Sequence, residues 1–252
     1  MKIQIEPLRK TDTHLIPKLI ESGMDQDIFA LTIFSARGYE NYLKNLLLIP
    51  ENNRTVKLYG AFVDGQLAGY SEWRIFEKSI FLNNIYVFPE FQGIGIGKIL
   101  LIKHGRKLMN KYEKKVMSLD VFENNAEALS WYQRIGFDKE NVTHWYLGEQ
   151  TSIPISDRCY IEHYPKAIAE QEAYDFSMFT CSTNKGVYQI GRIKNQYYRL
   201  TDSEGLNDLG LLHCLYKLAP NRRLLLLTNE IPSSPASFRL ACKSYRMSLE
   251  LN

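Results

Sequence analysis

The chain has 252 residues, of which 45% are hydrophobic and 12% aromatic, and its formal net charge is +3. This composition supports a packed core and excludes an intrinsically disordered chain, and the small net charge without a basic block argues against a nucleic-acid partner. The apolar runs are too short to cross a bilayer and the N-terminus lacks the apolar segment of a secretory signal, so we expect a cytoplasmic protein with no membrane partner.

The first part of the chain alternates between strand and helix patterns. In chain order we expect a strand at 2–6, helices at about 11–22 and on to about 48, strands at 56–63, 66–76 and 80–87, a helix at about 99–109, a strand at 116–122, a helix at 126–135 and two short strands from 137 onward. Asp64-Gly65 predicts a tight hairpin turn between the second and third strands. A helix that crosses between two strands implies a mixed α/β sheet.

Three alternating glycines, Gly93, Gly95 and Gly97, stand between a predicted strand and a predicted helix. Without Cβ atoms they let a ligand approach the backbone, and N–H groups at a helix N-terminus attract anions. The loop is not a P-loop, because Ile99 stands where Ser or Thr is needed, and Lys98 breaks the dinucleotide-binding spacing G-x-G-x-x-G. The spacing therefore predicts a phosphate-bearing ligand of another class.

Two motifs resemble those of the GNAT N-acetyltransferase superfamily. Gln92-x-x-Gly95-x-Gly97 resembles its pyrophosphate-binding signature and follows the strand segment LNNIYV. The second motif, further along the chain, consists of Asn125, Ala128, Tyr132, Gly136 and Phe137. The resemblance covers about residues 1–148 and implies an acetyl-CoA-dependent N-acetyltransferase with the GNAT fold.

The resemblance also implies which groups bind acetyl-CoA. The loop that Gln92 opens would bind the pyrophosphate through its backbone N–H groups. These groups belong to Gly93, Ile94, Gly95, Ile96, Gly97 and Lys98. The main chain of Ile85, Tyr86 and Val87 would pair with the pantetheine arm as an added strand does, and its donors could polarise the thioester carbonyl. Asn125 would bind the pantetheine side or, as a helix N-cap, fix the turn before its helix.

Catalysis requires an acid and a base. By resemblance, Tyr132 is the general acid beside the departing CoA sulfur. Many family members carry a Glu on the strand before the glycine loop, where this chain has Asn83 and Asn84. Asp120 occupies the position, twelve residues before the tyrosine, at which the ribosomal-protein N-terminal acetyltransferases carry a Glu, and Glu72 on the preceding strand is a second candidate base. Catalysis through ordered water is the third option.

Residues 151–252 repeat, with shorter elements, the order of three strands, a helix and a strand that is expected for residues 56–122. Strands are expected at 174–181, 187–193 and 196–201, then a helix at 206–218, a strand at 223–228 and a last strand at 238–249. Asp202-Ser203-Glu204-Gly205 stands where the phosphate loop would be, and its two carboxylates would repel a pyrophosphate. We expect a catalytic GNAT domain in residues 1–150, followed in 151–252 by a degenerate GNAT-like domain, or an unrelated α+β unit, without a cofactor site.

The resemblance implies direct acetyl transfer to a primary amine of a small molecule, such as an antibiotic or an amine metabolite. Acetylation of a protein N-terminus or lysine is an alternative that the position of Asp120 favours. The Asn83-Asn84 pair also leaves open a CoA-binding regulatory module without catalysis. Either a monomer or a homodimer is compatible with the sequence.

The four cysteines lie in the second half of the chain without a Cys-x-x-Cys pair, at Cys159, Cys181, Cys214 and Cys242. This spacing favours reduced thiols over disulfides or a zinc site. The five histidines are scattered, so no metal site is expected.

Overall fold

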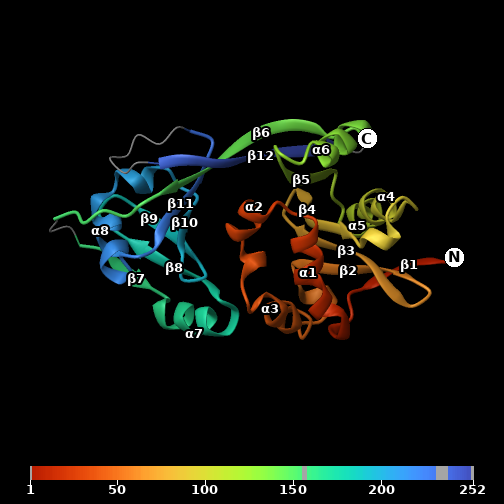
Figure 1. Cartoon of the computed structure of the whole chain (residues 1–252), viewed down its shortest axis with the longest axis horizontal. Coiled ribbons are helices and arrows are strands. Elements are labelled where there is room, and N and C mark those ends of the chain that lie inside the picture. Colours follow the sequence, from red (N-terminus) through yellow and green to blue (C-terminus); the bar gives the residue numbers. More distant parts are fainter. Residues whose placement is uncertain (1, 155–157, 231–237, 251–252) are drawn as a thin grey trace. The chain divides into compact units, whose positions relative to one another are not determined.

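The computed structural model describes residues 2–154, 158–230 and 238–250, and these form two compact units (Figure 1). Unit 1 consists of Met1–Met24, Tyr42–Asn141 and Tyr245–Asn252, and unit 2 of Asp25–Asn41 and Val142–Ser244. Two long strands, β6 (Asp138–Gly148) and β12 (Phe238–Glu250), contribute residues to both units. In the part of the chain that the structure describes, no helix has the length and apolar character needed to cross a membrane.

Unit 1 is built on a mixed sheet with the strand order β1-β2-β3-β4-β5, followed by β12 and β6. Its first five strands are β1 (Ile3–Pro7), β2 (Val56–Val63), β3 (Gln66–Ile75), β4 (Ser79–Val87) and β5 (Val116–Phe122). The first four are antiparallel to their neighbours, and β5 is parallel to β4 because a helix carries the chain between them. The predicted mixed α/β sheet is confirmed.

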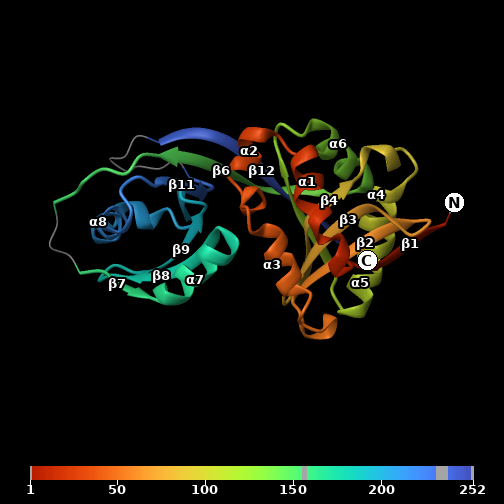
Figure 2. The same ribbon diagram turned by 60° about the horizontal axis from the view of Figure 1, so that its bottom comes forward.

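Helices cover both faces of this sheet (Figure 2). On one face lies α1 (Ile16–Ser22), preceded by a 3-10 turn (Lys10–Leu15). The other face carries one continuous helix, which runs from α4 (Ile96–Lys98) through a π-helical segment (Ile99–His104) into α5 (Gly105–Lys111). Leu101, Leu108 and Met109 recur on one side of it and are at most 1% exposed, so this side forms the core with Trp73.

The turn residues of unit 1 explain where its elements end. Asp64 and Gly65 both have positive φ, 49° and 86°, which is the backbone twist that a two-residue hairpin needs. Gly136 ends α6 (Ala126–Ile135) with φ 106°, where a side chain would be strained. The predicted hairpin and helix end are confirmed. The two short strands expected after residue 137 are instead the single strand β6, which pairs with β11 at its far end.

In unit 2 the strands follow the order β6-β11-β10-β9-β8-β7, in which each is paired with the next. Its elements are α2 (Gln26–Ala30), β7 (Tyr160–Glu162), α7 (Tyr164–Tyr174), β8 (Phe176–Ser182), β9 (Val187–Ile193), β10 (Tyr197–Leu200), α8 (Leu209–Leu218) and β11 (Arg223–Thr228). α3 (Tyr39–Leu46) spans the boundary between the units. The expected order of three strands, helix and strand is confirmed, whereas β7 and α7 were not predicted.

Candidate active site

Strands β4 and β5 part in the middle of the sheet of unit 1. They pair from Ser79 opposite Val116 as far as Leu82 opposite Leu119. Beyond Leu82, Asn83 is an extra residue with no counterpart on β3, a bulge that bends the strand. Residues 84–87 remain paired with β3 along one edge, and among the described residues no strand pairs with their other edge. Their main chain can therefore pair with an extended ligand.

The parted strand leads directly into the glycine loop. Gly93 and Gly95 have φ of 77° and 86°, and Gly95 is the N-cap of the helix. The first helical hydrogen bond runs from Ile99 N to Gly95 O, so the N–H groups of the first helical turn, on Ile96, Gly97 and Lys98, have no acceptor within the helix. These N–H groups and the helix dipole together attract an anion.

The space in front of the loop suits a phosphate-bearing ligand. A Cβ atom added to Gly93 or Gly95 would meet no protein atom within 4 Å, so a ligand can reach the backbone there. Gln92 donates from Nε2 to the carbonyl of Val87 at 3.1 Å and so holds the start of the loop to the end of β4. The residues present therefore fit the pyrophosphate of CoA.

The two sequence motifs meet in space at Gly97. A Cβ at this position would lie 3.6 Å from the ring of Trp131 on α6, which is ordinary van der Waals contact. Asn125 caps that helix by accepting from Ala128 N at 3.1 Å, which is the structural role that its sequence context allows. The structure thus brings α6 beside the glycine loop.

Tyr132 on α6 is buried, with 6% of its surface exposed. Its ring contacts those of Trp131 and Phe137, with centroids 5.1 and 5.8 Å away. Burial raises the pKa of Tyr132 well above its ordinary value, and the nearby Tyr86 hydroxyl adds to this increase. The phenol is therefore protonated near neutral pH and can serve as a hydrogen-bond or proton donor.

Glu72 on β3 has a buried carboxylate, with 2% of the residue exposed. Asn83 Nδ2 donates to Oε1 at 2.9 Å, and Asn84 Nδ2 and the Tyr70 hydroxyl donate to Oε2 at 3.2 and 3.1 Å. Arg74 Nη2 lies 3.7 Å from Oε1. These donors and the guanidinium compensate for the removal of the carboxylate from water.

Cross-strand pairing places Glu72 on a face with other polar groups. Glu72 is opposite Asn84, and Tyr70 is opposite Tyr86, so all four side chains share one face of the β3–β4 pair. The ring of Tyr86 packs against Gly23 at the end of α1, where a Cβ would lie 2.6 Å from it. The sequence singled out the two asparagines only as residues that cannot act as a base, and missed that they hold Glu72. Their contact with Glu72 depends on the pairing register between β3 and β4, which the sequence does not reveal.

Asp120 on β5 has a different environment. Both of its carboxylate oxygens accept from the guanidinium of Arg246 on β12, with Nη2 to Oδ2 at 3.0 Å, and its side chain is 41% exposed. The structure does not bring Asp120 into the hydrogen-bond network of Glu72 in the described residues. Its partner comes from the last strand of the chain, which sequence spacing does not reveal.

The corresponding turn of unit 2, between β10 and α8, lacks such an N–H cradle. Asp202 Oδ1 accepts from Glu204 N at 2.9 Å, and Asp208 Oδ1 accepts from Leu211 N at 3.1 Å. Asp208 is 1% exposed and caps α8. Two N–H groups of this turn and of the start of α8 are therefore satisfied by the chain's own carboxylates.

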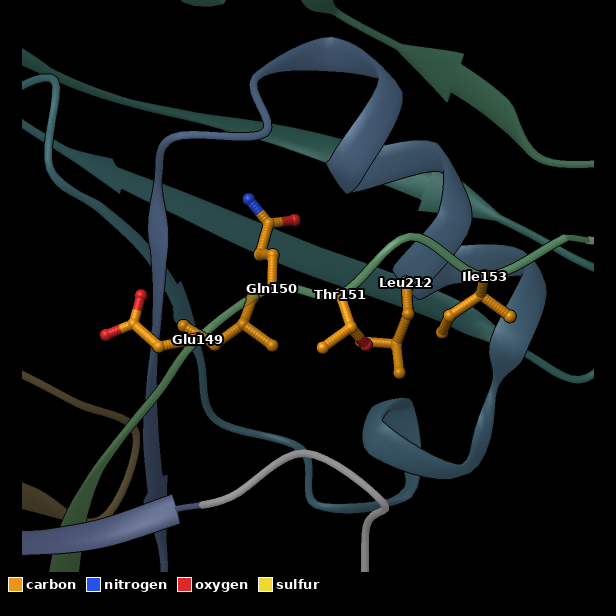
Figure 3. Close-up of a pocket in the computed structure, with 6 residues that line it drawn as sticks. Glu149, Gln150, Thr151, Ile153 and Leu212 are labelled. Carbon is orange, nitrogen blue, oxygen red and sulfur yellow. The ribbon is translucent and has the colours of Figure 1, made fainter.

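A small pocket in unit 2 does not coincide with any predicted site residue (Figure 3). The segment after β6 forms one wall, and the lining residues are Glu149, Gln150, Thr151, Ile153, Leu212 and Leu224. Gln150 donates to the carbonyl groups of Ala219 and Arg222 and so secures the chain that follows α8. We interpret this pocket as part of the packing of unit 2.

Part of this chain is similar in sequence to known acetyltransferases. Residues 27–137 match the model of the acetyltransferase (GNAT) family. A spermine/spermidine N(1)-acetyltransferase of Bacillus subtilis is 27% identical over 118 residues, which cover 42% of this chain and 78% of the relative. A spermidine N(1)-acetyltransferase of Thermoplasma acidophilum is 31% identical over 100 residues, which cover 40% of this chain and 62% of the relative.

A solved structure extends the likeness to the whole chain. A tandem GNAT protein from the clavulanic acid biosynthesis pathway has a TM-score of 0.68 and 10% identity, and the match covers 99% of this chain and 98% of that protein. At this identity the match shows a shared fold. The predicted GNAT fold, followed by a GNAT-like second half, is confirmed.

Proposed function

Because this chain belongs to the GNAT acetyltransferase family, we propose that it transfers an acetyl group from acetyl-CoA directly to a primary amine of a small molecule. It is an acetyl-CoA-dependent N-acetyltransferase. The observation that carries the proposed site is the parting of β4 from β5, which leads into the glycine loop and lies beside the buried carboxylate of Glu72.

The chain's own groups suit the two polar parts of the donor. When bound, acetyl-CoA supplies a thioester as the acetyl donor, with the CoA thiolate as its leaving group. The N–H groups of residues 93–98 would hold the pyrophosphate, because the loop leads into the start of the helix, where the first N–H groups have no acceptor within the helix. The main chain of Ile85, Tyr86 and Val87 would pair with the pantetheine amides, and Asn125 would support this side from α6.

Tyr132 is the proposed general acid. Its buried phenol keeps its proton because burial raises its pKa, and it stands on the helix that contacts the loop. A phenol that stays protonated can donate a hydrogen bond to the developing thiolate and so stabilise the leaving group. Because a thiolate is a weaker base than a phenolate, this stabilisation does not require complete transfer of the proton. Its packing beside Trp131 and Phe137 fixes the direction of the ring.

Glu72 is the proposed general base. The amine must lose a proton before or during attack, and an ionised carboxylate or a water bound to it can accept that proton. Glu72 is buried beside the parted strand, where it accepts from two amides and a phenol and has Arg74 3.7 Å away. Asp120 is 41% exposed, and both of its oxygens accept directly from Arg246. Asp120 and ordered water alone are the competing assignments.

The acceptor is proposed to be a small aliphatic amine. The relatives from Bacillus subtilis and Thermoplasma acidophilum are named for spermine and spermidine acetylation. The match to the family model, over residues 27–137, includes the proposed site residues. Acetylation of a protein N-terminus draws its support from Asp120, which the ion pair with Arg246 keeps engaged. We therefore place the small amine first.

Unit 2 is proposed to be a degenerate GNAT-like domain, so the chain has one cofactor site. The reason is the acidic turn before α8, where carboxylates occupy the N–H groups that a pyrophosphate would need. The catalytic domain is then unit 1, and unit 2 has a role other than cofactor binding.

A thiol-release assay tests this function. The full chain is incubated with acetyl-CoA and a panel that contains spermidine, other small primary amines, a secondary amine and peptides with a free N-terminus. We expect CoA thiol to be released with a small primary amine and to saturate with its concentration. Release with peptides alone would instead favour a protein acceptor, and binding of acetyl-CoA without release for any amine would favour a regulatory module.

A further inference from the structure

Three of the four cysteines lie together in unit 2. The Sγ atoms of Cys159, Cys181 and Cys214 are all within 4.8 Å of one another, and no disulfide joins them. Cys242, on β12, is not part of this group. The acetyl-transfer function proposed above makes no use of the three thiols.

The fold explains why these thiols meet. Cys181 on β8 is opposite Ile161 on β7, so these two side chains lie on the same face of the sheet. Cys159 precedes Ile161 by two residues, and strand alternation places its side chain on that face as well. That face is covered by α8, because Leu211 and Leu215 pack in the same core as Cys181. Cys214 lies between these two leucines on the helix. The segment before β7, strand β8 and helix α8 therefore each contribute one sulfur.

The spacing of the sulfurs suits a single metal ion. A Zn²⁺ ion binds thiolates at about 2.3 Å, which separates three such sulfurs by about 3.8–4.0 Å. Sulfurs already within 4.8 Å need only small side-chain movements to reach this arrangement. Binding would replace the three S–H protons with three metal–sulfur bonds and release the protons to solvent.

The surroundings favour a soft ion and leave a route to it. Cys181 is fully buried in an apolar core, whereas Cys159 and Cys214 are half-buried, so the group opens toward solvent on one side. A water on that side can complete a tetrahedral site. The neighbouring Asp208 accepts from Leu211 N and from Thr183, so it holds α8 in place and is not needed as a ligand.

We propose that Cys159, Cys181 and Cys214 form a three-thiolate site for a thiophilic ion of the Zn²⁺ class, which ties the segment before β7 to β8 and α8. Sulfur donors in an apolar setting select such ions over Mg²⁺ and Ca²⁺, which prefer oxygen. The site belongs to unit 2 and stands independently of the acetyl-transfer chemistry.

Titration of the reduced full chain with Co²⁺, followed by Zn²⁺, tests this site. We expect one Co²⁺ per chain, a thiolate-to-cobalt charge-transfer absorption, and its disappearance when Zn²⁺ displaces the cobalt. Cys159→Ser and Cys214→Ser should each weaken Co²⁺ binding at least about 10-fold. Cys242→Ser, which removes a half-buried thiol outside the group, should bind Co²⁺ as the wild type does.

Circular dichroism of the metal-free variants verifies folding, and either serine variant suffices if the other does not fold. Absence of the charge-transfer absorption in the reduced wild type overturns the site. Its retention in a folded Cys159→Ser or Cys214→Ser variant, or its loss in Cys242→Ser, also overturns it. A chain that is isolated with a disulfide among these cysteines, and that binds no Co²⁺ after reduction, leads to the same conclusion.

Discussion

Asn83 donates from Nδ2 to Oε1 of Glu72 at 2.9 Å, and it does so from the bulge at which β4 leaves β5. The same residue therefore forms the bulge at which the two strands part and holds a buried carboxylate beside it. Asn84 completes the arrangement through the other carboxylate oxygen, at 3.2 Å. The asparagines that stand in place of a catalytic Glu hold a carboxylate supplied by the neighbouring strand.

Replacement of Glu72 tests its role as the base. We expect Glu72→Gln to lower kcat at least about 100-fold, because positioned acid–base groups contribute factors of this size. Acetyl-CoA affinity should change little, because Glu72 is not part of the glycine loop. Steady-state kinetics and calorimetric binding measure the two effects separately, and thermal unfolding verifies that the variant folds.

Asp120→Asn is the matched control for this replacement. It removes a charge from the competing carboxylate and weakens an ion pair that is 41% exposed, so stability should change by at most about 1 kcal/mol. We expect kcat to stay within about threefold of the wild type. A large loss of kcat in Asp120→Asn with little change in Glu72→Gln would assign the role of base to Asp120. If kcat were unchanged in both variants, ordered water would be the proton acceptor.

Tyr132→Phe tests the general acid. The substitution removes only the hydroxyl and keeps the aromatic contacts with Trp131 and Phe137, so the fold should be preserved. We expect kcat to fall about 100-fold and the Kd for acetyl-CoA to remain nearly constant. Because burial raises the pKa of Tyr132, wild-type turnover should show no loss from its ionisation up to about pH 10. Unchanged turnover in the variant would remove Tyr132 from the mechanism.

Gly95→Val tests the glycine loop, and Gly65→Val provides a matched control. Both glycines have φ of 86°, and a Cβ at either meets no atom within 4 Å, so the backbone strain of the two substitutions is similar. Only the valine at position 95 fills the space before the N–H groups. Isothermal calorimetry should show lost acetyl-CoA binding for Gly95→Val and retained binding for Gly65→Val. Tight binding by Gly95→Val would contradict the loop assignment.

One chain should bind one acetyl-CoA. Calorimetric titration of the wild type should give a stoichiometry of one, because the turn before α8 satisfies its own N–H groups through Asp202 and Asp208. Asp202→Ala should leave this stoichiometry unchanged, since Asp208 still caps the helix. Two equivalents for the wild type would mean that unit 2 also holds a cofactor.

His104 makes unit 1 sensitive to acid. Burial, aided by Lys107, lowers the pKa of His104 from 6.5 to about 4, and its Nε2 is buried without a hydrogen-bond partner in the described chain. The unfolded state then binds more protons between these two values, so stability is lost as the pH falls through this window. Between pH 7 and pH 5 the loss from this group is about 2 kcal/mol.

Urea unfolding at the two pH values measures this loss. His104→Leu should reduce the difference in unfolding free energy between pH 7 and pH 5 by about 2 kcal/mol, because the variant has no imidazole to protonate. The exposed His14 offers a control, and His14→Leu should leave the difference unchanged. An equal pH dependence in wild type and His104→Leu would show that another group controls acid sensitivity.

Local patterns predicted much of the fold. Strand 116–122 and helix 126–135 match the structure at both ends, because alternation and the glycine at position 136 mark their limits. The π-helical segment and the merging of two expected strands into β6 were not predictable in this way, because both depend on partners distant in the sequence. The same limit applies to α7, which has no acidic residue in its first turn and no glycine after its last turn.

The candidate site shows a similar division. The glycine loop and the Asn125 helix were identified because their residues are neighbours in the sequence. The network of Glu72 was not, because it depends on which residues of β3 and β4 lie opposite each other across a bulge. The partner of Asp120 and the grouping of three cysteines likewise arise from strand and helix packing, which motif spacing does not encode.

Mass spectrometry of a small primary amine incubated with acetyl-CoA and the full chain tests the proposed function most directly. With spermidine as the acceptor, we predict that mono-N-acetylated amine and CoA thiol appear in equal amounts, and that Glu72→Gln slows both to the same extent. CoA thiol that accumulates equally without an amine, or an acetyl-CoA complex that yields no N-acetyl product with any small primary amine, would contradict the proposed function.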